Sequence, residues 1–192
     1  MPYNGKKRFF ENYRKEIVGD SIGAYMRYKF EVPTVVEMKV GVSYVSIENA
    51  RENLNKETSG KSFEQVLEET QKEWNEYLSR IEVEGGSEND KTIFYTALYH
   101  TLIHPNTLND SNGEYPSMKT RETLKADNTR FTVFSLWDTY RNLHQLMSLV
   151  YPKQQSDMVK SMLQIYEESG WLPKWELNAT ETSTMVGDPA GI

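Results

Sequence analysis

The alternation of hydrophobic and polar residues predicts extended structure near the start of the chain. Between residues 25 and 47 the period is two, which predicts antiparallel strands at 25–30 and 34–47. One face of the second strand carries Val36, Met38, Val40, Val42 and Tyr44, and the other carries Glu37, Lys39 and Ser43. Such a strand has one face toward water, and Gly41 within it indicates a bulge or a bend. Residues 1–24 have no such pattern, and we expect irregular structure there.

The pattern then changes to a helical period. Residues 46–60 are polar, but an apolar stripe predicts a helix from residue 63 to about 78 and consists of Phe63, Val66, Leu67, Thr70, Trp74 and Tyr77. Ser62 and Gln65 have the spacing of a capping box at the start of this helix. Because Trp74 lies on the stripe, we expect it in the core.

A second helix is predicted to begin at Asn89 or Asp90 and to end at Pro105, which cannot continue a helix. It is apolar on nearly every side, so burial is expected for Ile93, Phe94, Ala97, Leu98, Thr101 and Leu102. The polar stretch 106–128 then predicts turns, with Asn112-Gly113 at a hairpin.

Three further elements are predicted beyond residue 130. They are a short strand at 131–134, a helix over 136–150 capped by Ser135, and a helix from Ser156 or Asp157 to the C-cap Gly170. The inward faces of these helices carry Leu136, Tyr140, Leu143, Met147 and Val150, and Met158, Met162, Ile165 and Tyr166. Two successive amphipathic helices beside loops with aromatic and acidic residues are typical of a helical barrel.

Composition excludes several classes of function. The net charge is −6 and the pI is about 5.2, so the chain lacks the basic surface of a nucleic-acid-binding protein. It has no cysteine, so it has neither disulfides nor thiolate chemistry. No apolar run approaches the roughly 20 residues of a membrane span, and the first residues, MPYNGKKRFFENYRKE, do not resemble a signal peptide.

Two short patterns could bind a metal, but neither is convincing. His100 and His104 lie four residues apart, a spacing that suits zinc, yet no glutamate stands between them as in H-E-x-x-H and no third ligand is near. Residues 110–114, DSNGE, lack the alternating ligands of a calcium loop, so we interpret them as a hairpin.

Residues 131–190 hold the most informative chemistry. Three of the four tryptophans lie there among acidic residues. Carboxylates beside indole rings suit sugars, because the C–H faces of a pyranose stack on the indole while carboxylates accept hydroxyl hydrogen bonds or perform acid–base chemistry. The residue pattern equally allows tryptophans in the core and acids as helix caps.

Several longer motifs favour the first interpretation. WDTYRNLHQL, GWLPKWEL and ETSTMVGDPA, in this order, resemble glycoside hydrolase family 92, the calcium-dependent, exo-acting α-mannosidases. Upstream, VGVSYVSIENAR, SRIEVEGG, KTIFYTALYHTLIHPN and NGEYP resemble the same family. The resemblance runs from about Val35 to Ala190.

The resemblance implies a mixed, mostly α-helical fold that forms part of a longer enzyme. Residues 1–50 would be the C-terminal part of an N-terminal β-sandwich, residues 51–85 a helical linker, and residues 86–192 the first helices of an (α/α)6 catalytic barrel. It also implies hydrolysis of terminal α-linked mannose from mannans or N-glycans with inversion, with mannose-containing glycans as partners.

Site residues follow from the family motifs position by position. Glu181 matches the general acid, although Ala179-Thr180 stands where the family usually has Gly-Asn. Trp137 and Asp138 match the pair that lines the mannose pocket. Arg141, Trp171 and Trp175 are expected to support or wall that pocket, with Glu176 behind them.

The remaining parts of the mechanism are expected beyond this chain. By the resemblance, the base that activates water and most of the calcium ligands follow Ile192, so we expect the isolated chain to be inactive and to self-associate. Localisation is unknown from these residues; the resemblance implies a secreted or periplasmic parent. The alternative is a small non-catalytic carbohydrate-binding or interaction module.

Overall fold

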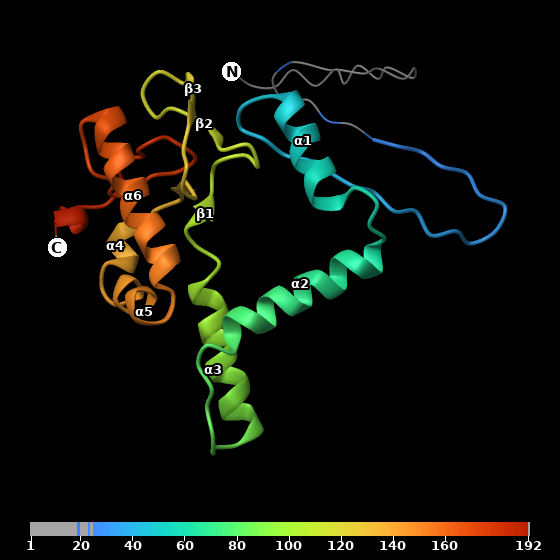
Figure 1. Cartoon of the computed structure of the whole chain (residues 1–192), viewed down its shortest axis with the longest axis horizontal. Helices are drawn as coiled ribbons and strands as arrows, with labels where there is room; N and C mark the ends of the chain where they lie inside the picture. The colour runs from blue at the N-terminus through green and yellow to red at the C-terminus, as the bar shows by residue number, and fades with distance from the viewer. Residues whose placement is uncertain (1–18, 20–22, 24, 192) are drawn as a thin grey trace, which may run out of the picture. The chain divides into compact units, whose positions relative to one another are not determined.

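The computed structural model describes residues 19, 23 and 25–191, and the chain divides into two compact units, Met1–Val36 and Glu37–Ile192. Nearly all of the stretch 1–24, expected to be irregular, lies outside the described residues. The second unit combines helices with very short strands and is mostly helical, as predicted (Figure 1). The proposed sandwich, linker and barrel boundaries stay predictions.

The elements follow one another along the second unit. In chain order they are α1 (Ile47–Thr58), α2 (Phe63–Leu78), α3 (Glu88–Thr101), β1 (Asn106–Thr107), β2 (Glu114–Pro116), β3 (Thr123–Lys125), β4 (Phe131–Thr132), α4 (Leu136–Thr139), α5 (Leu143–Val150), α6 (Pro152–Ser169) and the 3-10 turn η1 (Pro189–Gly191). None of the helices in this described part is long and apolar enough to cross a membrane.

The strands predicted at 25–30 and 34–47 are wrong. Residues 25–46 form no strand, and their apolar side chains are exposed, Met38 to 71%. A strand needs a neighbour to satisfy its backbone groups, and the described part of the chain offers this segment none. Lys39 instead donates to the carbonyls of Thr58 (2.9 Å) and Lys61 (2.7 Å).

Helix α1, which the hydrophobic pattern did not predict, is held by polar contacts. Ser46 caps its first turn by accepting from the Asn49 amide. The buried Asp110 carboxylate accepts from the Ser43 hydroxyl (2.6 Å) and from the side-chain amides of Asn49 (2.8 Å) and Asn53 (2.7 Å). Asp110 therefore fastens α1 to the turn 110–114.

The turn at Asn112-Gly113 is present, but it does not connect paired strands. Gly113 has a φ of +89°, and its amide donates to Asp110, closing the turn between β1 and β2. The antiparallel pairs are β1 with β4, where Asn106 faces Thr132, and β2 with β3, where Tyr115 faces Leu124. The predicted strand 131–134 is confirmed in its first half.

Helix α2 starts where its cap predicts, whereas α3 starts at Glu88 rather than at Asn89 or Asp90, because Ser87 is its N-cap. Both helices bury less than their apolar faces suggest. The Ser62–Gln65 capping box is confirmed, and α3 begins with a second one, Ser87 with Asp90. No residue of α2 is fully buried, and of the residues expected inside α3 only Leu98 is. Only some of their apolar residues, among them Tyr77, Leu78 and Phe94, pack partly against the core, so the prediction of burial is wrong for the others. Trp74 is half-buried, its ring 4.7 Å from that of Tyr99.

The helix predicted over 136–150 is broken into α4 and α5. At the break, side-chain contacts replace helical backbone hydrogen bonds. The side-chain amide of Gln145 donates to the Tyr140 carbonyl at 3.2 Å, and the Thr139 hydroxyl lies 3.0 Å from His144 Nε2. The next helix, α6, starts at Pro152 rather than at Ser156 or Asp157, because proline fits the first helical turn.

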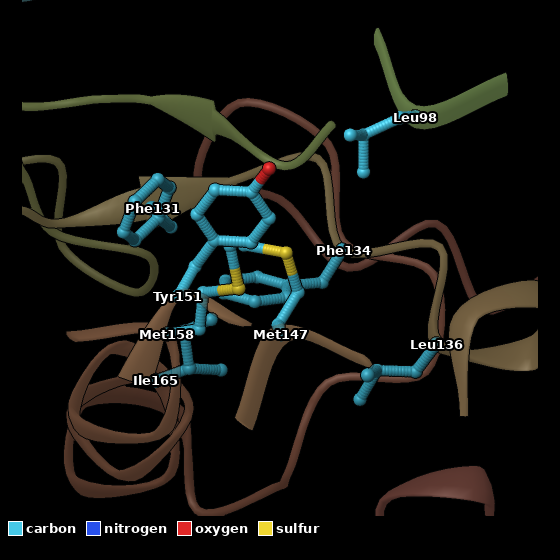
Figure 2. Packing of buried hydrophobic residues seen from close by; sticks show 8 residues of the cluster. All are labelled: Leu98, Phe131, Phe134, Leu136, Met147, Tyr151, Met158 and Ile165. Atoms are coloured by element: carbon cyan, nitrogen blue, oxygen red, sulfur yellow. The ribbon is translucent and has the colours of Figure 1, made fainter. Parts of the chain in front are cut away.

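One hydrophobic core joins these elements. It consists of Leu98, Phe131, Phe134, Leu136, Met147, Tyr151, Met158 and Ile165. Figure 2 shows Tyr151 in the middle of this cluster, with Leu98 at its edge. The Tyr151 hydroxyl donates to the Tyr77 carbonyl (2.9 Å), so the C-terminal end of α2 is tied to the core. A smaller cluster of Leu108, Tyr115, Ala126 and Ala179 lies beside the site described below.

We predict that Gly41→Ala loosens the segment 39–43 from α1. A Cβ at this glycine would lie 2.2 Å from the Ala50 carbonyl oxygen, so the backbone must separate. Overpacking of this kind costs about 1–3 kcal/mol. Hydrogen exchange in α1 should accelerate. Gly23→Ala is the control, since its Cβ would meet nothing within 4 Å; equal exchange in both variants would contradict the prediction.

We also predict that isolated residues 1–192 self-associate. The outer face of α6 exposes Val159, Leu163 and Tyr166 at helical spacing, so the inward position predicted for Tyr166 is wrong. Large exposed apolar patches favour association. Light scattering should give a mass above 22.4 kDa, and Leu163→Glu should lower it. A monomer at every concentration would refute this expectation.

Candidate functional site

The predicted site residues lie on two segments that the fold brings together. The first is the Asp138 turn, residues 135–141, which follows β4 and contains α4. The second is the site loop, residues 171–185, which follows α6. Ser135 and Trp175 form an antiparallel bridge, and the Glu176 amide donates to the Phe134 carbonyl at 3.2 Å. The site loop therefore runs alongside the start of the Asp138 turn.

Glu181 is held inside the site loop by backbone amides. Its carboxylate accepts from the N–H groups of Lys174 (2.9 Å), Trp175 (3.2 Å) and Ser183 (3.0 Å). The side chain is half-buried, and Glu181 also bridges to Glu176. It is thus neither a free surface acid nor a buried core residue. Both oxygens act as acceptors in this arrangement.

Asp138 is exposed and accepts a hydrogen bond from the hydroxyl of Ser135. Arg141, which the spacing places near Asp138, lies instead over the rings of Trp137 and Tyr140, 5.1 Å from each centroid. This cation–π contact fixes the indole of the half-buried Trp137. The carboxylate of Asp138 keeps an open side.

The two tryptophans of the site loop differ in environment. Trp171, directly after the C-cap Gly170 (φ +83°), is 77% exposed. Trp175 is half-buried, and its indole N–H is enclosed without a hydrogen-bond partner among the described residues. Trp175 thus borders the Glu181 carboxylate, whereas Trp171 contributes an open aromatic surface.

Glu176, expected behind the pocket, is completely buried. Its carboxylate accepts from the Thr132 hydroxyl (2.6 Å), the Val133 amide (2.8 Å) and the Ala179 amide (2.6 Å). Burial raises the pKa of Glu176 above its ordinary value, while the hydrogen bonds from Thr132 and Ala179 and the charge of Arg130 act in the opposite direction. Sequence reasoning could not identify this role, because its partners are up to 44 residues away.

A second buried charge cluster supports the same region. Arg130, fully buried, donates to the Phe131 carbonyl at 2.8 Å and lies 3.5 Å from the Glu168 carboxylate. Glu168 also accepts from the Tyr115 hydroxyl (3.0 Å) and the Met118 amide (2.8 Å). These contacts connect β4, the β2–β3 hairpin and α6.

The backbone of the site contains several residues in the left-handed region. Positive φ angles occur at Val133 (64°), Asn178 (48°), Ala179 (58°), Ser183 (56°) and Met185 (65°). Such a conformation costs a residue other than glycine roughly 1–2 kcal/mol, and for β-branched valine it is rare. Ala179 stands where the resemblance implies glycine. Its left-handed backbone is a conformation that glycine adopts readily, so a glycine would fit this position without strain.

The other candidates contribute no site. In the described part of the chain, no three His, Cys, Asp or Glu side chains group closely enough to hold a metal ion. Residues 110–114 serve to hold α1. A cavity of about 500 Å³ lies elsewhere, lined by residues that include Trp74, His104 and Asp157; none of the predicted site residues borders it.

Comparisons with known proteins agree with the motifs. The model of the glycosyl hydrolase family 92 catalytic domain matches residues 49–192. A solved GH92 α-mannosidase of Bacteroides thetaiotaomicron is 36% identical, with a TM-score of 0.73 over 77% of this chain and 20% of that one. It has also been solved in complex with mannoimidazole. An inverting GH92 mannosidase of the same organism is 31% identical, with a TM-score of 0.70 over the same shares.

A curated relative extends the comparison to a fungus. An uncharacterized secreted glycosidase of Arthroderma benhamiae is 26% identical over 176 residues, which are 88% of this chain and 18% of the relative. The chain thus spans about one fifth of the length of these proteins. The family predicted from the motifs is confirmed, because the family model covers most of the chain. The chain belongs to glycoside hydrolase family 92.

Proposed function

We propose that the full-length gene product hydrolyses terminal α-linked mannose from mannans or N-glycans, with inversion. Membership of the family supports glycoside hydrolysis, and the solved relatives are named as α-mannosidases, one of them inverting. The observation that carries the proposal is the Ser135–Trp175 bridge, which sets the Asp138 turn beside the loop with Glu181.

The Asp138 turn would bind the terminal sugar. The Asp138 carboxylate has one oxygen on the Ser135 hydroxyl and can accept sugar hydroxyls with the other. Trp137 would wall the ring, with Arg141 covering part of the indole. Trp171 and Trp175 would form the edge of the pocket, Trp171 with an open aromatic surface.

Glu181 would be the general acid that protonates the departing glycosidic oxygen. An acid must carry a proton, whereas both Glu181 oxygens now accept from backbone amides. Protonation would therefore release at least one of these contacts and turn an oxygen toward the leaving group. Release of the Ser183 amide alone would leave the carboxyl fastened to residues 174 and 175.

Inversion also needs a base, placed roughly 6.5–9.5 Å from the acid. Glu176 is saturated with donors and Asp138 is assigned to the sugar, so neither is proposed for this role. We assign neither the catalytic base nor a calcium ligand to these residues. Secretion of the enzyme is proposed from the relative labelled as secreted.

One observation favours the alternative of sugar binding without catalysis. The three amide contacts of Glu181 would order the site loop even if Glu181 never donated a proton to a substrate. Mannoimidazole binding without hydrolysis of any α-mannoside by the full-length gene product would support this alternative.

We predict that Glu181→Gln in the full-length gene product lowers kcat by about 10²–10⁴-fold on α-mannosides with poor leaving groups. Aryl mannosides, whose leaving groups need little protonation, should lose less. Steady-state kinetics on both substrate classes test this, with the exposed Glu167→Gln of α6 as control. Equal losses on the two classes would assign Glu181 a structural role.

We predict no turnover by isolated residues 1–192, with or without calcium, because neither Glu176 nor Asp138 is proposed to activate water. Release of the chromophore from an aryl α-mannoside is the measurement. Turnover that survives dilution and disappears in Glu181→Gln would show that these residues contain a base.

A further inference from the structure

Glu176 lies where the two segments of the proposed site meet. On one side it accepts from Thr132 and Val133, directly before the Asp138 turn. On the other it accepts from Ala179, two residues before Glu181. We propose that Glu176 is a positioning residue whose buried carboxylate fixes the Asp138 turn relative to the loop that carries Glu181. This inference rests on the proposed mannosidase function.

The backbone conformation at both contacts supports this role. The two amides that donate to Glu176 belong to Val133 (φ 64°) and Ala179 (φ 58°), which are both left-handed without being glycine. Such residues keep this conformation only where the surroundings determine it. Hydrogen bonds to an ionised carboxylate are stronger than neutral ones. Glu176 is thus the group that stabilises the unusual turn on each side.

The contacts require a carboxylate rather than any polar group of this size. One oxygen of Glu176 accepts from Thr132 and Ala179, and the other accepts from Val133. A glutamine has one acceptor oxygen, so its NH2 group must face an amide N–H of either Val133 or Ala179. In Glu176→Gln, the contact to Val133 or the contact to Ala179 is therefore lost whichever way the side chain turns.

Glu168 provides a matched control. It is also a buried carboxylate and accepts from a hydroxyl, that of Tyr115, and from an amide, that of Met118. It touches neither the Asp138 turn nor the site loop through these contacts. In Glu168→Gln the oxygen can keep the Met118 amide, while the NH2 group faces the Tyr115 oxygen and Arg130, which loses its carboxylate partner. Both substitutions remove a buried charge, but only one disturbs the site.

The first test is kinetic and uses the full-length gene product. Glu176→Gln should lower kcat by about 10²-fold on α-mannosides with poor leaving groups, since small misplacements of a catalytic group have this effect. The loss on aryl mannosides should be smaller, as for Glu181→Gln, because a misplaced acid matters least there. Glu168→Gln should lower the thermal midpoint without this dependence on the leaving group. The same profile in both variants would overturn the proposal.

The second test does not need activity. Hydrogen exchange should accelerate at Val133 or Ala179, and at the Lys174 amide that Glu181 holds, in Glu176→Gln but not in Glu168→Gln. Unchanged exchange at these amides would refute the positioning role. If the unmodified gene product hydrolyses no α-mannoside, the proposed function fails. Accelerated exchange would then still support the link between the two segments.

Discussion

Buried carboxylates that must find hydrogen-bond donors organise this structure. The strands have only two or three residues, and the hydrophobic core is small. Asp110 fastens α1, Glu168 ties the β2–β3 hairpin to α6, and Glu176 joins β4 to the site loop. A buried charge without partners is strongly unfavourable, so each carboxylate fixes the segments that supply its donors.

The same constraint explains how an irregular loop can hold the candidate site residues in fixed positions. Residues 171–185 have almost no regular structure, and several have left-handed backbones. Glu176 and Glu181 accept from backbone amides on both sides of the loop, which restrains its path without a sheet or helix. The aromatic residues around it then need only to pack, and Arg141 holds Trp137 in place by a cation–π contact.

Family membership and local geometry support different parts of the function. The chain belongs to glycoside hydrolase family 92 and spans about one fifth of the length of its solved relatives. The geometry adds that the Asp138 turn and the Glu181 loop are neighbours. Within the described residues, no three His, Cys, Asp or Glu side chains lie close enough together to hold a metal ion.

The sequence by itself determined the family, the Ser62–Gln65 capping box and the helix stop at Gly170, because these depend on motifs or on neighbours a few residues apart. It also singled out Glu181 and Asp138. Tertiary structure decided what depends on distant partners. Residues 34–47 alternate like a strand but find no adjacent strand, and the polar stretch 47–58 becomes helical against Asp110. The role of Glu176 is equally invisible in the sequence, since its donors come from segments that meet only after folding.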